Sequence, residues 1–240
     1  LSPNSFVLKW WTLTSDTGGE APQDAIDFLQ AAGWGEESID DYRAKFGGFG
    51  KWMSPPPDSF KRMTDGDRIQ IGDHVWEVVV GRGHSPEHAC LWCPELKLMI
   101  SGDQVLPRIS SNVSVFPTEP DNDPLSDWLA SIASIKARVP DDTLVLPAHN
   151  DPFFGLHARL DNLNNGHEVS LKRLLRTLAQ PKRAIDVFPS LFGRKIDSPL
   201  LLGLATGESL AHLNCLVRRG QITRTRDAEG VDWYQAQPWA

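Results

Sequence analysis

The chain has 240 residues, 40% of them hydrophobic and 23% charged, and its formal net charge is −7 at pH 7. This length is enough for one large domain or two modest ones with a real hydrophobic core. No apolar run approaches the roughly 18 residues that span a bilayer, and no signal-peptide pattern opens the chain, so we expect no membrane partner and a cytoplasmic location.

The first sixty residues contain two predicted short helices, at 22–32 and 36–46. A proline opens the first helix, Gly33 follows its end, and Gly47 follows the second helix. Aromatic residues and prolines surround both helices: Trp10, Trp11, Trp34, Phe46, Phe49, Trp52 and Pro55 to Pro57. These residues predict a lid or insert over a pocket, and the alternative is that they pack this segment onto the core.

From residue 67 the pattern indicates β-structure. The predicted strands are 68–71, 74–80, 89–93 and 96–100. Turns at 72–73 and 94–95 join them into two hairpins. Cys90 and Cys93 fall in the third strand and Cys215 in a later helix, so we expect three buried thiols, and their odd number argues against a disulfide framework.

The middle of the chain alternates helix and strand. An amphipathic helix is predicted at 127–139, where Pro140 stops it, and a strand of the buried type follows at 143–146. A long helix at 156–178 then leads towards the C-terminus. Strands that alternate with helices in this way are typical of an α/β layered sheet whose site lies along one edge.

The charge changes sign along the chain. Residues 1–164 contain 13 Lys and Arg against 24 Asp and Glu, whereas residues 165–226 contain 11 against 4. The predicted elements of this basic part are helices at 184–192, 200–204 and 208–219 and a hairpin of strands at 221–226 and 231–235. We therefore predict two domains, an acidic one at 1–164 and a basic one at 165–240.

Three short motifs each place a metal-ligand side chain at or just past the end of a hydrophobic run. They are Gly-His-Ser-Pro-Glu-His at 83–88, Ser-Gly-Asp at 101–103 and Pro-Ala-His at 147–149. A strand would end at each point, and a loop could hold the side chain over a sheet edge. Zinc binds imidazole nitrogen and carboxylate oxygen, and a catalytic site normally needs three protein ligands. Three candidate ligands are sufficient for one metal ion and too few for two.

In this order the motifs resemble the metallo-β-lactamase superfamily, in the branch with a small winged-helix domain after the hydrolase core. The resemblance implies an α/β fold, the C-terminal part of an αββα layered sandwich followed by a winged-helix domain. It also implies that His84 binds the first metal, that Asp103 bridges and is catalytic, and that His149 binds the second. His88 would be structural or would orient a ligand. Family members carry an upstream His-x-His-x-Asp-His motif that this sequence does not contain, so we expect a core that is incomplete at its N-terminus.

The activity that the resemblance implies is hydrolysis by a metal-bound hydroxide of an ester, thioester, lactone or phosphodiester bond in a small-molecule substrate. Two zinc ions are expected in the intact site, and iron or manganese are the alternatives. The loop that leaves Asp103 is well placed to meet a substrate, and its candidate binding residues are Arg108, Ser111 and Asn112. Packing of the loop explains the same residues nearly as well.

A function of a different class stays open. The chain could be a non-catalytic fragment or a nucleic-acid-binding module that acts through the basic winged-helix domain. Arg218, Arg219, Arg224 and Arg226 could neutralise the phosphates of RNA. The alternative is that these charges are solvated and that the small domain serves packing or homodimer formation, and the acidic body would repel a polyanion.

Overall fold

The structure is a computed structural model that describes residues 19–48, 59 and 61–237. Of the aromatics of the predicted lid, Trp10, Trp11, Phe49 and Trp52 lie outside these residues, as does the triple proline. The chain divides into two compact units. Among the described residues, we call 61–113 with 124–169 the sheet unit, and 19–48, 59, 114–123 and 170–237 the helical unit. These units are discontinuous in sequence, whereas the predicted domains at 1–164 and 165–240 are continuous and stay a prediction.

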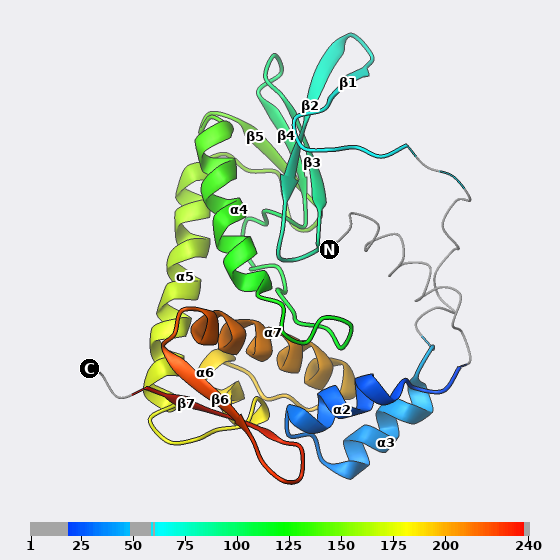
Figure 1. Cartoon of the computed structure of the whole chain (residues 1–240). Coiled ribbons are helices and arrows are strands. Elements are labelled where there is room, and N and C mark those ends of the chain that lie inside the picture. Colours follow the sequence, from blue (N-terminus) through cyan, green and yellow to red (C-terminus); the bar gives the residue numbers. More distant parts are fainter. Residues whose placement is uncertain (1–18, 49–58, 60, 238–240) are drawn as a thin grey trace. The chain divides into compact units, whose positions relative to one another are not determined.

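A five-stranded sheet forms the centre of the sheet unit, with the strands in chain order from one edge to the other (Figure 1). The strands are β1 Arg68–Ile71, β2 His74–Gly81, β3 His88–Cys93, β4 Leu98–Gly102 and β5 Leu144–Pro147. Neighbours are antiparallel except β4 and β5, which are parallel. Both predicted hairpins are confirmed, although β4 begins two residues late because Lys97 has a φ of 49° in the turn.

One face of the sheet packs against helix α4, Pro124–Arg138. The pleat places Val79, Cys90 and Met99 on this face, where each is at most 1% exposed. Arg138 of α4 donates from Nε to Glu77 Oε1 at 2.7 Å on the same face. Burial raises the pKa of the Cys90 thiol to about 12, so this cysteine stays protonated.

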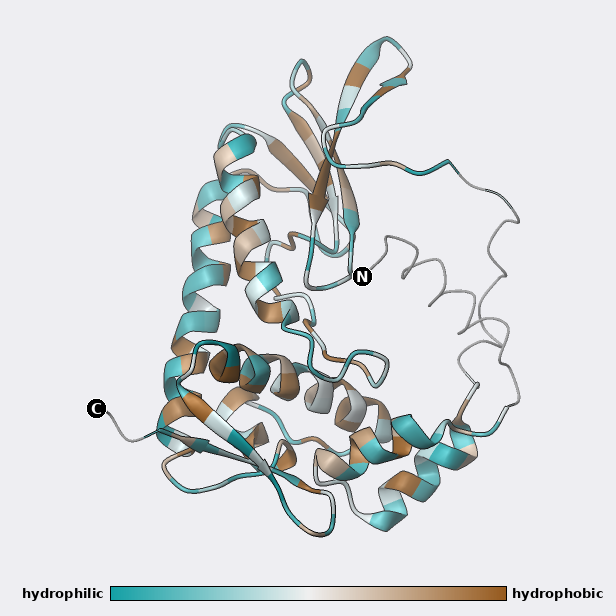
Figure 2. Ribbon diagram, viewed as in Figure 1, coloured by the Kyte–Doolittle hydropathy of each residue, from teal (hydrophilic) through white to brown (hydrophobic). Residues whose placement is uncertain are grey.

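Helix α5, Leu156–Thr177, lies beside α4 (Figure 1). Lys136 of α4 and Asp161 of α5 form an ion pair, with Nζ 2.7 Å from Oδ2. Hydrophobic residues predominate in strands β2 to β5, whereas much of the visible surface of α5 is hydrophilic (Figure 2). The sheet unit is thus a mixed α/β structure, as the sequence predicted.

The helical unit combines residues that are far apart in the sequence. Its elements are α2 Gln23–Ala31, α3 Glu36–Lys45, α6 Phe188–Leu191, α7 Pro199–Arg218, β6 Ile222–Arg226 and β7 Asp232–Ala236. The predicted helix at 184–192 is instead a 3-10 turn, Ile185–Val187, followed by the single turn of α6. Pro189 lies at the start of α6, where its missing N–H is tolerated. β6 and β7 form the predicted hairpin, and the winged-helix assignment stays a prediction.

Helix α7 is the core helix of this unit. The prediction of two helices, at 200–204 and 208–219, was wrong, because the helix runs without a break through Gly207. Within the described part of the chain α7 is long and apolar enough to cross a membrane by length and composition. From Ala205 to Leu216 all residues but Glu208 are buried in the protein, which is typical of a core helix.

Gly207 permits a close approach between α7 and the segment at 114–115. A Cβ atom at this position would meet Ser114 Oγ at 2.7 Å and the Val115 carbonyl oxygen at 3.0 Å. We expect Gly207→Ala to lower the free energy of unfolding by about 2 kcal/mol through overpacking. Gly203→Ala, on the same helix with open space around it, should raise it by up to about 1 kcal/mol through helix propensity. Urea unfolding measures both, and two equal effects would contradict this packing.

Candidate functional site

The three predicted ligands leave three strands at one edge of the sheet. β2, β4 and β5 run in the same direction, since β2 and β4 are each antiparallel to β3 and β4 is parallel to β5. His84 follows β2, Asp103 follows β4 and His149 follows β5. The carboxyl ends of strands that run in one direction lie at a common edge, so the topology alone brings these side chains together.

The side chains of the three residues converge on one carboxylate. His149 Nε2 lies 3.3 Å from Asp103 Oδ1, and His84 Nε2 lies 4.0 Å from Asp103 Oδ2. Each imidazole therefore faces a different oxygen of the same group. The Asp103 side chain is 34% exposed, and those of His84 and His149 are 31% and 63% exposed, so an ion from solvent can reach all three.

The orientation of His84 leaves Nε2 as the ring nitrogen that can bind a cation, because Nδ1 faces a backbone carbonyl. Its Nδ1 lies 2.8 Å from the backbone carbonyl oxygen of Asn112, which can only accept, so Nδ1 carries the proton. In the neutral ring Nε2 is then an acceptor, and it faces a carboxylate that is also an acceptor. A cation bound between these two acceptors would make the arrangement favourable. A bond from the second ring nitrogen to a carbonyl is the usual partner of a metal-binding histidine.

His88 lies close to this group but is more enclosed. Its ring centroid is 6.3 Å from that of His84, and its Nε2 lies against the position that a Cβ atom on Gly102 would take. Burial, and then the charge of His84, lower the pKa of His88, so that its neutral form is favoured. These contacts suit the predicted supporting role, which stays a prediction.

The loop that follows Asp103 forms hydrogen bonds with two of the candidate ligands. The hydroxyl of Ser111 donates to the backbone carbonyl of Asp103, and the Asn112 carbonyl accepts from His84. Ser111 is buried, and Arg108 is exposed, with its Nη2 3.6 Å from Asp151 Oδ2. Ser111 and Asn112 thus contact metal-ligand candidates, whereas Arg108 contacts Asp151. The role of all three residues towards a substrate stays a prediction.

Arg159, which no sequence pattern singled out, anchors this loop. From α5 its Nε donates to the Leu106 carbonyl at 2.6 Å and its Nη2 to the Ile109 carbonyl at 2.8 Å. Burial lowers the pKa of this guanidinium, which nevertheless stays charged. An arginine within a helical pattern carries no signal of such a contact, because its partners are backbone atoms some fifty residues earlier in the chain.

The side chains of His84, Asp103 and His149 are of the types that bind divalent metals. Two imidazole nitrogens and one carboxylate are ligands that zinc prefers, and iron or manganese accept them too. Among residues 19–48, 59 and 61–237, however, no group of three or more His, Cys, Asp or Glu side chains is arranged around a single metal position. The assignment of His84, Asp103 and His149 to two metal positions, which the sequence resemblance implied, stays a prediction.

The other four histidines make contacts of a different kind. Their partners are Glu95 for His74, the Val139 carbonyl for His157, Ser110 for His167 and the Glu208 carbonyl for His212. None of these four contacts involves Asp103. His74, His157 and His212 therefore serve as internal controls for the site, whereas His167 contacts the loop that follows Asp103.

Two family models match the chain. One, described as "Metallo-beta-lactamase superfamily", matches residues 19–149, and another, described as "Metallo-beta-lactamase-like, C-terminal domain", matches residues 171–237. The first match covers more than half of the chain and includes all three ligand candidates.

Solved structures share this fold. A beta-lactamase domain protein from Burkholderia ambifaria is 36% identical with a TM-score of 0.82, over 89% of this chain and 61% of that protein. A metallo-beta-lactamase family protein from Thermus thermophilus is 23% identical with a TM-score of 0.72, over 90% of this chain and 64% of that protein. An uncharacterized protein of Aquifex aeolicus is 27% identical over 106 residues, 48% of its length. The chain thus spans less than two thirds of each of these proteins.

Proposed function

The chain belongs to the metallo-β-lactamase superfamily, whose members are mostly metal-dependent hydrolases, and we propose that it acts in the hydrolysis of an ester, thioester, lactone or phosphodiester bond. Its substrate would be a small molecule, and zinc would be the metal, with iron or manganese as alternatives. His84, Asp103 and His149 would be the metal ligands.

One observation supports the proposal above all others. Two imidazole Nε2 atoms flank the two oxygens of a single carboxylate, at 3.3 and 4.0 Å. One of these rings, His84, is oriented by a bond to a backbone carbonyl. A carboxylate with a nitrogen donor beside each oxygen suits a bridging ligand between two metal positions.

The chemistry divides between the metal and the chain. A metal held by these residues would act as a Lewis acid, a role that polarises the oxygen of a scissile bond and lowers the pKa of bound water to about 7. His84 and His149 would donate nitrogen lone pairs, and Asp103 would contribute negative charge to both metal positions. Arg108, exposed on the adjoining loop, would attract an anionic substrate group.

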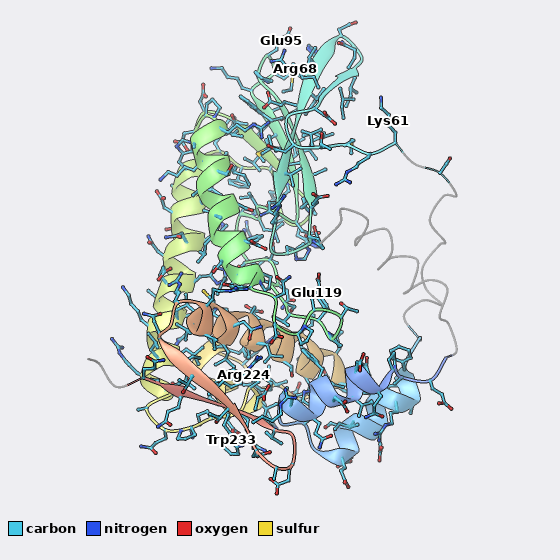
Figure 3. The ribbon with its side chains drawn as sticks, in the orientation of Figure 1. Lys61, Arg68, Glu95, Glu119, Arg224 and Trp233 are labelled. Atoms are coloured by element: carbon cyan, nitrogen blue, oxygen red, sulfur yellow. The ribbon has the colours of Figure 1, made fainter. Side chains whose placement is uncertain are left out.

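No observation favours the nucleic-acid-binding alternative. Arg224 donates from Nη2 to Asp121 Oδ1 at 2.8 Å, and Arg226 makes two bonds to Asp232, at 2.7 and 2.9 Å (Figure 3 labels Arg224). Two of the four arginines that the sequence offered for phosphate binding are therefore already neutralised by carboxylates. Binding of RNA would have to compete with these pairs.

Hydrolysis assays on the zinc-loaded 240-residue chain test the proposal. The substrates would be one chromogenic compound from each of the four bond classes, and the matched variants are His149→Ala and His74→Ala. We expect hydrolysis of at least one class that a chelator abolishes and zinc restores, lost in His149→Ala and kept in His74→Ala. No hydrolysis of any class, or equal activity of the two variants, would contradict the proposal.

A further inference from the structure

The helical unit contains a pocket of about 360 Å³ that no step of the proposed hydrolysis uses. One side of the pocket comes from Trp34 and from α3, which begins two residues later, and the other from residues between 196 and 202, around the start of α7. The lining is mainly apolar, with contributions from Ile196, Pro199 and Leu202. Its size suits a small organic molecule rather than a chain segment.

Two aromatic side chains, Trp34 and Tyr42, line the pocket. Trp34 and Tyr42 pack edge to face, with centroids 6.5 Å apart and an interplanar angle of 87°. The indole Nε1 of Trp34 donates to Thr206 Oγ1 at 2.9 Å, which fixes its ring. Aromatic rings attract cations through their quadrupole, and fixed rings lose little entropy when they bind one.

The rim of the pocket is acidic. Glu37, Asp41 and Asp197 line it, and among the described residues of the lining the only cation is Lys45. Lys45 Nζ lies 2.6 Å from Asp41 Oδ2, so these two charges cancel locally. Glu37 and Asp197 are exposed, and they leave the lining with two net negative charges.

We propose that this pocket binds a small organic cation of the alkylammonium class. Apolar walls with aromatic rings favour an alkylated nitrogen over a bare metal ion, and the described residues hold no three-ligand metal group here. The two uncompensated carboxylates favour a cation over a neutral molecule of the same shape. The site goes beyond the proposed hydrolysis and involves none of its residues.

Calorimetric titration of the 240-residue chain with choline tests this site. The isostere 3,3-dimethylbutan-1-ol has the same shape but carries carbon in place of the charged nitrogen. We expect choline to bind in the millimolar range and the isostere at least about fivefold more weakly, since a cation–aromatic contact contributes about 1 kcal/mol. Absence of choline binding, or equal binding of the two, would overturn the proposal.

A pair of double variants locates the binding. Glu37→Gln with Asp197→Asn removes two charges from the rim, and Glu36→Gln with Asp40→Asn removes two charges from α3 outside the pocket lining. We expect the first pair to weaken choline binding about fivefold and the second pair less than about twofold. All four positions are surface carboxylates, so both variants should fold. Equal losses in the two would mean that choline senses only net charge, and would overturn the site.

Discussion

Asp103→Asn is expected to lower kcat/KM for zinc-dependent hydrolysis at least about a hundredfold, since loss of groups that merely support metal ligands already costs about 10–100-fold. Both imidazoles face this one carboxylate, at 3.3 and 4.0 Å from its two oxygens. An amide keeps the shape but removes the charge and replaces one oxygen donor with an NH₂ group, which cannot bind a metal in the same way. Steady-state kinetics of the two zinc-loaded proteins, with whichever substrate of the panel is hydrolysed, measures the loss.

A neighbouring carboxylate provides the matched control. Asp151→Asn changes an exposed side chain whose ion pair is with Arg108, at 3.6 Å. We expect it to leave catalysis within about threefold, as is usual for an exposed ion pair. Full activity of Asp103→Asn, or an equal loss in Asp151→Asn, would show that Asp103 has no special part in the reaction.

Gly83→Ala is expected to destabilise the protein by about 3 kcal/mol or more, because strain and overpacking add. Gly83 precedes the His84 ligand candidate and has a φ of 103°, in the region that favours glycine. An added Cβ would lie 2.6 Å from the Pro124 carbonyl oxygen and 2.6 Å from Cβ of Trp128. Trp128 is fully buried, so neither neighbour can move away cheaply.

Gly72→Ala separates the cost of backbone strain from the cost of overpacking. Gly72 also has a positive φ, 58°, but a Cβ there meets nothing within 4 Å. We expect this variant to lose only about 1–2 kcal/mol, the cost of the left-handed conformation. Chemical denaturation with a common slope gives both values. A loss in Gly83→Ala no greater than that in Gly72→Ala would contradict the tight packing of the first motif on α4.

Local patterns predicted most of the secondary structure and the position of the three candidate ligands after strand ends. The turn at Gly72 fixed the first hairpin, and the motif residues His84, Asp103 and His149 each follow the strand that the sequence indicated. Strand ends that share a direction share an edge of the sheet, whereas the parallel pairing of β4 with β5 and the distances between the three side chains come from the structure.

Contacts across long stretches of sequence could not be predicted in this way. Gly207 lies in the gap between the helices predicted at 200–204 and 208–219, and the pattern does not reveal that Ser114 packs against it in one continuous helix. Arg224 and Arg226 looked free to bind phosphate, although Asp121 and Asp232 neutralise them. In each case tertiary structure, and not the local sequence pattern, determines which residue lies next to the side chain or glycine.

The most direct test of the metal site is a zinc titration that observes the ring nitrogens of all seven histidines by ¹⁵N-detected magnetic resonance, with single substitutions to assign the signals. We predict that Nε2 of His84 and Nε2 of His149 shift on binding, that both shifts disappear in Asp103→Asn, and that His74, His157 and His212 do not respond. No shift at His84 and His149, or shifts only at the other histidines, would contradict the assignment of the metal site.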